Sequence, residues 1–484
     1  DARRTMLDRL KELERQASPL EPDEAQRRRL MERVNAYAQR FLESLEDAPA
    51  FVEDAPADEG GLQASPLSEE GVGLDEALKL VAQHVDRPGV NPASGRFLGY
   101  IPGGGLYYSA LGDFLAAVAN RYAGIFFASP GAVRMENMLL EWMGDLVGYP
   151  RSRGGNITSG GSIANLMGVV AARDAHGVEG EAVGRAVVYL TEHTHHSVDK
   201  ALRIAGMGNC VVRRVPVDGC FRMRPEVLEQ MIVADREQGL QPWLLVAAAG
   251  STNTGSVDSL AALGQIASEQ GLWYHVDGAY GGFFILCDEG RRRLQGIELS
   301  DSVVMDPHKT LFLPYGTGAV LVRDRATLAP SHHYTADYMQ DTDPAIEELS
   351  PAELSPELTK HFRGMRLWLP LKAVGLAPFR AALEEKMLLA RYFHQTLQTV
   401  EGFEVGPEPD LSVVIYRYVP RRGDPDAFNE RLAHALQQDG RVFVSSTRVQ
   451  GKFVLRAAIV SFRTHLDDVQ ETIRVLKETA RKLE

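Results

Sequence analysis

From about Ala93 onward, short apolar runs alternate with segments whose apolar residues recur every three or four positions. The short runs predict buried strands, and the segments between them predict amphipathic helices. A chain that alternates in this way builds β-α-β units, so we expect an α/β fold with a large, mostly parallel sheet and helices on both faces. The expected strands are Ala186–Leu190, Cys210–Val215, Leu244–Ala248, Leu272–Val276, Ser302–Met305 and Gly318–Val322. The expected helices include Ser162–Asp174, Ser197–Ile204, Pro225–Glu237 and Leu260–Glu269.

Two smaller parts flank the predicted sheet domain, which we assign to residues 93–375. Residues 1–92 are polar and show helical spacing in Arg3–Arg15 and Ala25–Leu45, so we expect an N-terminal helical docking segment. Residues 376–484 begin with a long helix and continue in the order β-α-β-β-α, which predicts a small C-terminal α+β domain. Its strands are expected at Ser412–Tyr418, Val442–Ser446 and Phe453–Val460.

Charge and composition exclude several classes of function. The net charge of −13 speaks against nucleic-acid and anionic-membrane binding, because both need a basic surface. The chain has no apolar run of about 18 residues, so we expect no transmembrane helix. Its three cysteines, Cys210, Cys220 and Cys287, are too few for a disulfide framework or a Cys-rich zinc site. We therefore expect a cytoplasmic protein with buried, reduced thiols.

A lysine follows one of the predicted strands. The segment Asp306-Pro-His-Lys309 comes directly after Ser302–Met305, so Lys309 lies at the carboxyl end of a sheet strand. Ligand sites of open α/β sheets gather at these ends. A partly desolvated lysine amine there can form an imine with an aldehyde cofactor. Taken alone, such a His-Lys pair is more often part of a surface loop.

A carboxylate closes the preceding strand. Asp277 ends an apolar run and precedes Lys309 by 32 residues, so two consecutive strands bring a carboxylate and an amine to the same sheet edge. Pyridoxal phosphate (PLP) needs this pair. The lysine holds the aldehyde carbon, and the carboxylate keeps the pyridine nitrogen protonated so that the ring accepts electrons. The alternative is that Asp277 only caps the turn before the glycines that follow.

A glycine-rich turn between a short strand and a helix predicts an anion site. Gly160 and Gly161 let the backbone approach an anion, Ser162 can donate its hydroxyl, and the helix N-terminus supplies free N–H groups. The turn lacks the Gly-Lys-Ser/Thr ending of a P-loop and the spacing of a dinucleotide fingerprint. We interpret it as a phosphate cup. A plain helix N-cap with flexible glycines is the alternative.

Three histidines stand within four residues after another strand, at positions 193, 195 and 196. A zinc site would need a further ligand, and no nearby Cys or Asp completes the set, so we predict no metal. A histidine stacked on the PLP ring fits better, with a solvated loop histidine as the alternative. The four segments each follow or adjoin a strand end, and one cofactor, PLP, explains all of them.

The chain resembles the group II PLP-dependent amino-acid decarboxylases, with the aromatic L-amino-acid decarboxylases as the nearest branch. The resemblance covers most of residues 25 to 480. It implies PLP fold type I and a homodimer with active sites at the subunit interface. The motifs that carry it are Ser159-Gly-Gly-Ser162, His195-His-Ser-Val-Asp-Lys-Ala201, Val276-Asp-Gly-Ala279 and Asp306-Pro-His-Lys309.

The resemblance also implies a role for individual residues. Lys309 matches the Schiff-base lysine, Asp277 the partner of the pyridine nitrogen, and His195 the ring-stacking histidine. Ala279 matches the residue packed under the ring. The other implied cofactor contacts are Gly161, Ser162 and His308 near the phosphate and Thr252 in the segment Gly250-Ser-Thr-Asn253.

The stretch Leu328–Lys360 fits no regular element, and a loop of this length is usually functional or disordered. Within it, Tyr338 matches a mobile-loop tyrosine that the family's decarboxylases associate with protonation of the product carbon. Related aldehyde synthases commonly have Phe there. We therefore expect a carboxy-lyase that converts an L-amino acid to its amine and CO2. The alternatives are aldehyde synthesis, transamination, retro-aldol cleavage, or a PLP-binding regulatory protein without turnover.

Three segments depart from the aromatic branch where the substrate side chain is expected. They are Pro102-Gly103-Gly104-Gly105, Ile125-Phe126-Phe127 and Pro314-Tyr315-Gly316. The aromatic residues in and near them suggest an apolar pocket, and hence an aromatic or bulky apolar substrate. Core packing of these rings is the alternative. The candidate pocket residues are Tyr107, Tyr108, Phe126, Phe127 and Tyr315.

Overall fold

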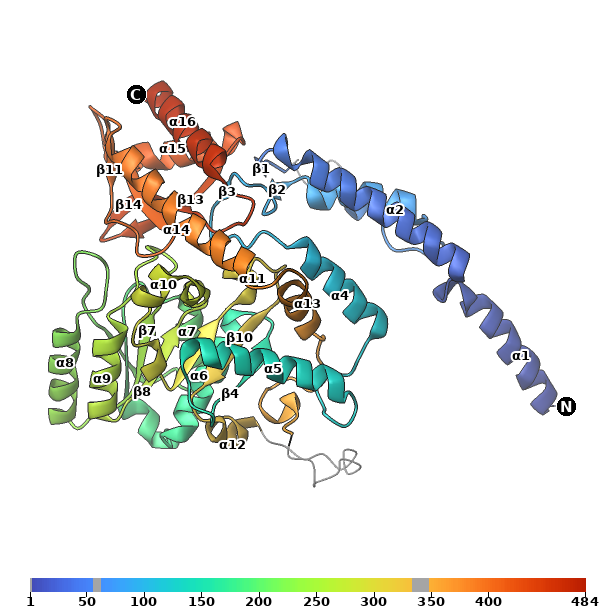
Figure 1. Ribbon diagram of the computed structural model, residues 1–484, viewed down its shortest axis with the longest axis horizontal. Helices are drawn as coiled ribbons and strands as arrows, with labels where there is room; N and C mark the ends of the chain where they lie inside the picture. The colour runs from blue at the N-terminus through green and yellow to red at the C-terminus, as the bar shows by residue number, and fades with distance from the viewer. Residues whose placement is uncertain (1, 55–61, 333–347) are drawn as a thin grey trace. The chain divides into compact units, whose positions relative to one another are not determined.

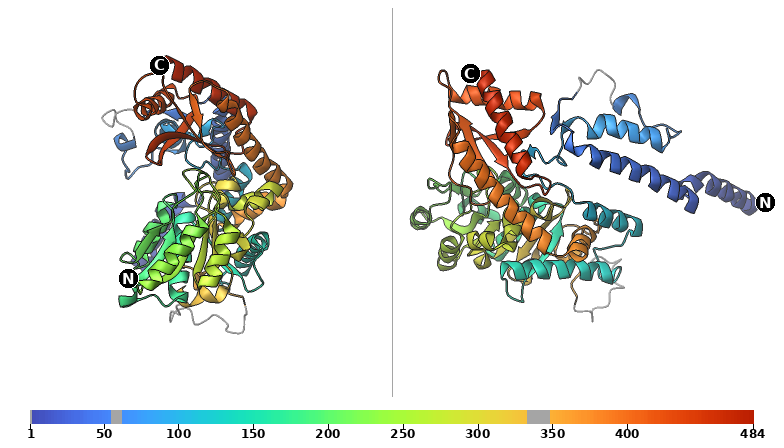
Figure 2. Two further views of the ribbon diagram at one scale, coloured as in Figure 1. Left: turned by 90° about the vertical axis from the view of Figure 1, so that its left-hand side faces the viewer. Right: turned by 45° about the horizontal axis from the view of Figure 1, so that its top comes forward.

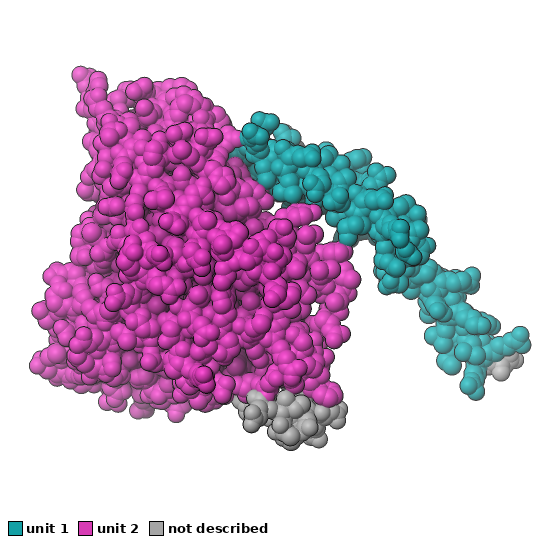
Figure 3. Space-filling view, in the orientation of Figure 1, with its two compact units in different colours: residues 1–91 teal, residues 92–484 magenta. Residues whose placement is uncertain are grey.

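The computed structural model describes residues 2–54, 62–332 and 348–484. Its chain divides into two compact units, Asp1–Asn91 and Pro92–Glu484, which Figure 3 shows in different colours. Figure 1 labels the elements of both units. Across the described ranges, none of the helices combines the length and the apolar character that crossing a membrane requires.

The first unit consists mainly of helices, as predicted. Asp23 caps the second helix by accepting from the backbone N–H of Gln26, whose side chain in turn accepts from the backbone N–H of Asp23. This reciprocal pair satisfies two donors that a helix start leaves open. The elements are α1 (Ala2–Ala17), α2 (Glu24–Glu43), α3 (Leu74–Val81) and the antiparallel pair β1 (Phe51–Val52) and β2 (Gly89–Val90).

The second unit is built around a seven-stranded sheet in the order β4-β10-β9-β8-β7-β5-β6. Strand β10 runs antiparallel to both of its neighbours, and the other four pairings are parallel, so the predicted mostly parallel sheet is confirmed. The strands are β4 (Gly154–Thr158), β5 (Ala186–Leu190), β6 (Val211–Arg214), β7 (Gln241–Ala248), β8 (Trp273–Asp277), β9 (Ser302–Met305) and β10 (Gly318–Val322).

Helices cover both faces of this sheet (Figure 1 and Figure 2). Successive side chains of a strand point to opposite faces, and β5 shows the consequence. Val187 and Tyr189 belong to the core under α5, α8 and α9, whereas Val188 and Leu190 belong to the core under α6 and α7. The helices are α5 (Pro130–Val147), α6 (Gly161–Ala175), α7 (His196–Ile204), α8 (Pro225–Glu237) and α9 (Leu260–Gln270).

A second sheet has five strands in the order β11-β12-β14-β13-β3. The helices that pack on this second sheet share one apolar core with its strands. The predicted β-α-β-β-α order of the C-terminal part is present. Two short strands, β11 and β3, were not predicted, and β3 joins the sheet from the start of the unit by pairing parallel to β13. The elements are β3 (Phe97–Leu98), α14 (Ala377–Gln398), β11 (Phe403–Val405), β12 (Val413–Tyr418), α15 (Pro425–Asp439), β13 (Phe443–Val449), β14 (Lys452–Ala458) and α16 (Leu466–Leu483).

Two sequence-based expectations need correction. The stretch Leu328–Lys360 is not free of structure, because α12 (Ala329–His332) and a 3-10 turn at Pro351–Glu353 lie in its described parts. Proline has the backbone φ that a helix needs, and it is the first residue of the 3-10 turn and the second residue of α12. The cysteines are not all buried: Cys287 is, whereas Cys210 is half-buried and Cys220 is exposed. Cys220 lies in the turn between β6 and α8, where the chain meets solvent.

Candidate active site

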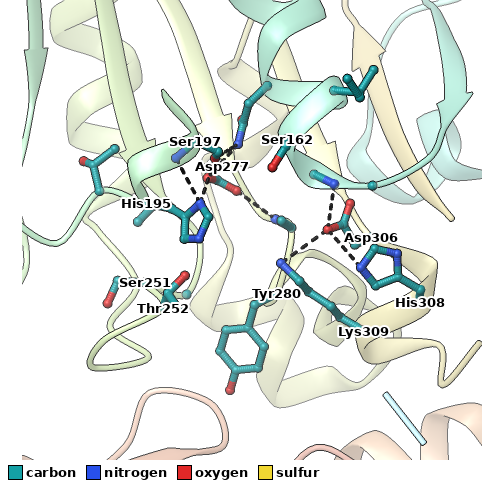
Figure 4. A pocket seen from close by; sticks show the side chains of 18 of the residues that line it. Ser162, His195, Ser197, Ser251, Thr252, Asp277, Tyr280, Asp306, His308 and Lys309 are labelled. Carbon is teal, nitrogen blue, oxygen red and sulfur yellow. Dashed lines mark hydrogen bonds and ion pairs between the residues drawn. The ribbon is translucent and has the colours of Figure 1, made fainter. Parts of the chain in front are cut away.

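A cavity of about 280 Å³ lies where the carboxyl ends of the parallel strands meet (Figure 4). Its walls come from the segments that follow β4, β5, β7, β8 and β9, because parallel strands deliver their ends to one sheet edge. All nine cofactor residues predicted from sequence line it. They are Gly160, Gly161, Ser162, His195, Thr252, Asp277, Ala279, His308 and Lys309.

Lys309 stands on the single helical turn α11 (Pro307–Thr310) that follows β9. Its Nζ lies 3.3 Å from Oδ2 of Asp306, whose side chain is 1% exposed. Burial raises the pKa of Asp306, although the neighbouring Lys309 and His308 oppose that change. The cavity therefore contains an amine and a buried carboxylate that can exchange a proton at short range.

His308 is fixed by its own backbone surroundings. Its Nδ1 accepts from the backbone N–H of Thr317 at 3.1 Å, so the neutral ring carries its proton on Nε2. That nitrogen is 3.7 Å from Oδ2 of Asp306. Burial lowers the pKa of His308, which favours this neutral form.

Asp277 ends strand β8 and presents its carboxylate to the cavity, with both oxygens hydrogen-bonded. Oδ1 accepts from the backbone N–H of Ala279 at 3.1 Å, and Oδ2 accepts from Nδ2 of Asn165, also at 3.1 Å. Two fixed donors hold the carboxylate in one orientation. A rigid carboxylate of this kind can stabilise a cationic ring nitrogen placed against it.

His195 caps the start of α7. Its Nδ1 accepts from the backbone N–H of Ser197 at 3.2 Å and lies 2.8 Å from the Ser197 hydroxyl. Burial lowers the pKa of His195, with Asp277 opposing that change, so the ring is neutral near pH 7. Because Nδ1 accepts, Nε2 carries the proton.

The glycine-rich turn forms a concave backbone surface at the start of α6. Gly160 has a φ of +157°, and a Cβ added there would lie 3.1 Å from Cε1 of His308. A Cβ added to Gly161 would lie 2.7 Å from Oδ2 of Asp306, which already accepts from the Gly161 N–H at 3.1 Å. Only glycine fits at both places. Within the described residues no side chain of the N-cap residue caps this helix, so the backbone N–H groups that follow that of Gly161 remain available to an anion.

The donor set fits PLP. The cavity combines a lysine amine, a carboxylate set apart from it, an imidazole and a helix N-terminus with glycines, which are the four groups that the cofactor's aldehyde, pyridine nitrogen, ring and phosphate require. Polar atoms in its walls also lack partners. Among the described residues, Oδ1 of Asp306 and both ring nitrogens of His193 are buried without a hydrogen bond. Buried polar groups of this kind indicate a site for a polar ligand.

The predicted substrate pocket is not assembled within this cavity. Tyr107, Phe126, Phe127 and Tyr315 are all absent from its walls in the described structure, so their assignment to a substrate pocket stays a prediction. Phe126 is buried beneath Arg134, whose guanidinium carbon lies 5.0 Å from the ring centroid, whereas the other three are exposed. The ring of Tyr315 lies 5.9 Å from that of His308, which does line the cavity. Tyr338 lies outside the described residues.

The sequence-based assignment missed several residues of the site. Asn165 contacts Asp277, Asp306 contacts Lys309, and Tyr280 lines the cavity with its hydroxyl 2.7 Å from that of Ser412. A signal for Asn165 was present, because it stands four positions after Gly161 and therefore on the same face of the helix. Within the described residues no group of three or more His, Cys, Asp or Glu is placed to hold a metal ion.

The sequence and the fold are similar to those of known proteins. Residues 75–419 match the family model described as the pyridoxal-dependent decarboxylase conserved domain. An aromatic-L-amino-acid decarboxylase of Bacillus atrophaeus is 33% identical over 405 residues, covering 83% of this chain and 82% of that protein. A phenylacetaldehyde synthase of Arabidopsis thaliana is 30% identical over 455 residues, covering 91% and 93%. A crystal structure of Oryza sativa TDC with PLP and tryptamine superposes with a TM-score of 0.89 at 26% identity, covering 96% of this chain and 99% of that one.

Proposed function

The chain belongs to the pyridoxal-dependent decarboxylase family, and from this membership we propose that it converts an aromatic L-amino acid to the corresponding amine and CO2. It is a carboxy-lyase of PLP fold type I with PLP as cofactor. The observation that carries the proposal is the meeting of Lys309, Asp277 and His195 in one cavity. The aromatic substrate is supported by the Bacillus and rice relatives.

Each group of the cavity has a proposed task. PLP, when bound, accepts the electron pair that the leaving carboxylate releases. Lys309 holds the cofactor until the substrate amine takes its place, and Asp277 keeps a proton on the pyridine nitrogen. By the family resemblance, His195 and Ala279 would hold the cofactor ring between them. Gly160, Gly161, Ser162 and His308 would hold the phosphate, and Thr252 would be a further cofactor contact; all of them line the cavity.

Proton transfer follows from the same groups. The amine of Lys309 must lose a proton before it reacts, and Oδ2 of Asp306 is 3.3 Å away to take it. His195 offers an Nε2–H as a donor because its Nδ1 is occupied. By the family resemblance, Tyr338 returns a proton to the product carbon. Closure of the loop that contains Tyr338 would exclude water from the site.

The decisive experiment is a product assay over a panel of amino acids. The purified chain with PLP is incubated with L-Phe, L-Tyr, L-Trp, L-Glu and L-Lys, and CO2 and amine are followed by mass spectrometry. We expect amine and CO2 in equal amounts from at least one aromatic amino acid. Aldehyde with ammonia as the main product would assign the chain to aldehyde synthesis. Turnover of L-Glu or L-Lys alone would overturn the aromatic assignment.

We further propose that the enzyme is a homodimer. Helix α4 (Tyr107–Ala119) exposes a run of large apolar side chains, which is typical of an interface with another protein surface. They are Tyr107, Tyr108, Leu111, Phe114, Leu115 and Val118, each at least 40% exposed. Tyr107, Phe127 and Tyr315 are then available to a substrate site shared by two copies. Light scattering should give twice the chain mass, and Leu115→Glu should shift it to the monomer.

We also propose how the chain is divided and where it acts. Residues 1–92 act as the docking segment, residues 93–375 bind PLP, and residues 376–484 form the small domain. The separate five-stranded sheet and its own core support the last division. The acidic net charge supports an enzyme that binds neither nucleic acid nor anionic membrane, and the three scattered cysteines support a cytoplasmic location. Cell fractionation and a vesicle-binding assay test these points.

A further inference from the structure

Asn165 connects two residues that the proposed function places on different parts of the cofactor. It lies in α6, its side chain is buried, and its Nδ2 is 3.1 Å from Oδ2 of Asp277 and 3.0 Å from the hydroxyl of Ser197. That hydroxyl is 2.8 Å from Nδ1 of His195. One amide group thus contacts the carboxylate directly and the imidazole through one intermediate. Figure 4 shows Ser197 between Asp277 and His195.

Trp273, Ser302 and His275 form a series of hydrogen bonds that ends at Asn165, and the chemistry of the donors fixes the direction of each bond. The indole Nε1–H of Trp273 can only donate, and it does so to the Ser302 hydroxyl at 2.8 Å. The Ser302 hydrogen is then directed to Nδ1 of His275, 2.7 Å away. Burial lowers the pKa of His275 to about 4, so its ring is neutral and carries its single proton on Nε2.

This proton fixes the amide of Asn165. Nε2 of His275 donates to Oδ1 of Asn165 at 2.8 Å, which leaves the NH2 group on the side of Asp277 and Ser197. A carboxylate can only accept, so this orientation also suits Asp277. The amide therefore donates twice, to Asp277 and to Ser197. The Ser197 hydrogen remains for Nδ1 of His195, whose proton must lie on Nε2.

We propose that Asn165 is a positioning residue that sets the orientation of the Asp277 carboxylate and, through the Ser197 hydroxyl, reinforces the tautomer of His195 that the Ser197 backbone N–H also favours. Each donor and acceptor in the chain from Trp273 to His195 is used in one consistent direction, so reversing one bond would leave another buried group unpaired. The two groups that contact the cofactor are thus prepared by the same buried amide. The inference rests on the proposed PLP site.

Four variants separate this role from simple packing. Asn165→Leu keeps the volume and removes all three hydrogen bonds. Ser197→Ala removes the hydroxyl that links Asn165 to His195, while the backbone N–H of residue 197 and the bond from Asn165 to Asp277 stay. Asn165→Asp replaces the NH2 group by a carboxyl that donates only when protonated. Asn429→Leu is the matched control, because Asn429 is also fully buried and bonded, but in the small domain against Tyr418.

The first readout is the visible absorption of bound PLP against pH. We expect Asn165→Leu to move the midpoint of this titration by at least about 0.5 pH unit, which corresponds to about 0.7 kcal/mol, while Asn429→Leu leaves it in place. The titratable groups that act on Asp277 are His195, His275 and Asp306, and they are unchanged in all four variants. A shift therefore reports the lost amide.

The second readout is the division between kcat and KM. We expect kcat to fall at least about tenfold in Asn165→Leu and less in Ser197→Ala, with KM within about threefold, because both side chains are proposed to act through Asp277 and His195. Asn165→Asp should regain kcat as pH falls, since protonation restores one donor. The leucine variant should show no such recovery.

The outcomes are distinguishable. If the wild-type chain binds PLP and makes amine, but Asn165→Leu matches Asn429→Leu in both the absorption midpoint and kcat, then Asn165 does not position the site. If Asn165→Leu does not fold, an unchanged kcat and pH profile in Ser197→Ala would overturn the coupling to His195. A wild-type chain that binds no PLP contradicts the proposed function instead.

Discussion

Arg456 of strand β14 donates a hydrogen bond of 2.7 Å from Nη2 to the backbone carbonyl of Thr252, so the second sheet holds a loop that lines the cofactor cavity. Nη1 of the same guanidinium donates to the Ser445 hydroxyl at 2.7 Å. Burial lowers the pKa of Arg456 to about 10, which leaves it a cation at neutral pH. The loop is thus tied to a rigid strand.

Replacing this arginine should weaken PLP binding. Arg456→Met retains much of the length but leaves the Thr252 carbonyl without its donor, so we expect the Kd for PLP to rise about tenfold, equal to about 1.4 kcal/mol. Fluorescence titration of the apoenzyme with PLP measures this. Arg448→Met, on the exposed side of neighbouring β13, is the control. Equal Kd values for the two variants would contradict the role of the Thr252 contact.

Lys309 should carry PLP covalently. Borohydride treatment of the holoenzyme, followed by proteolysis and mass spectrometry, should place the reduced pyridoxyl group on Lys309. Lys309→Ala should lose this adduct while keeping non-covalent PLP, because the other walls of the cavity remain. Recovery of the adduct from a different lysine of the wild-type protein would refute the central assignment.

Asp277→Asn should retain PLP and lose most activity. Asn has nearly the same shape but no charge, so it cannot stabilise a protonated pyridine nitrogen. Removal of one preorganised electrostatic group typically costs about 3 kcal/mol of transition-state stabilisation, so we expect kcat to fall by about two orders of magnitude. Steady-state assays with saturating substrate measure it. Activity within about threefold of wild type would remove this role from Asp277.

His275 should make the protein less stable in mild acid. Its pKa is lowered to about 4 in the folded protein, against about 6.5 when unfolded, so the unfolded chain alone takes up a proton between these values. The contribution of the neutral His275 ring to the free energy of unfolding is complete above pH 6.5. It is lost as pH falls through 4, which lowers the free energy of unfolding by up to roughly 3 kcal/mol. His275→Gln should therefore show a flatter profile of thermal unfolding midpoint against pH. The exposed His434→Gln should retain the wild-type slope.

Tyr338→Phe should change the product rather than abolish binding. Tyr338 is the proposed donor of the proton to the product carbon, and phenylalanine has no hydroxyl to supply it. We expect less amine and, in air, more aldehyde and ammonia, both measured by mass spectrometry. A variant that makes only amine at the parent rate would leave Tyr338 as a packing residue and reopen the identity of the acid.

Much of the sheet and cavity could be predicted because each feature has a local signal. Ser302–Met305 and Gly318–Val322 match β9 and β10 residue for residue, since each is a short apolar run with polar or turn-forming neighbours. Lys309 and Asp277 could be placed together because both follow adjacent parallel strands.

Other features depend on contacts that the local sequence does not encode. Strand β3 has two residues, too few for any periodicity, and it exists only because β13 pairs with it. An aromatic side chain has the same chemistry whether it packs in a core or lies on a surface. The sequence therefore does not indicate that Phe126 is buried and Phe127 exposed. Asn165 was missed because its partners come from three other segments of the chain.

The pairing of β3 with β13 has a consequence for synthesis on the ribosome. Phe97 and Leu98 leave the exit tunnel long before Phe443 and Val444 do. The second sheet therefore cannot be completed until β13 has been synthesised, and bringing such distant segments together is slow. A nascent chain of this protein should carry exposed apolar strand surface until β13 emerges. It is then the kind of client on which chaperones act.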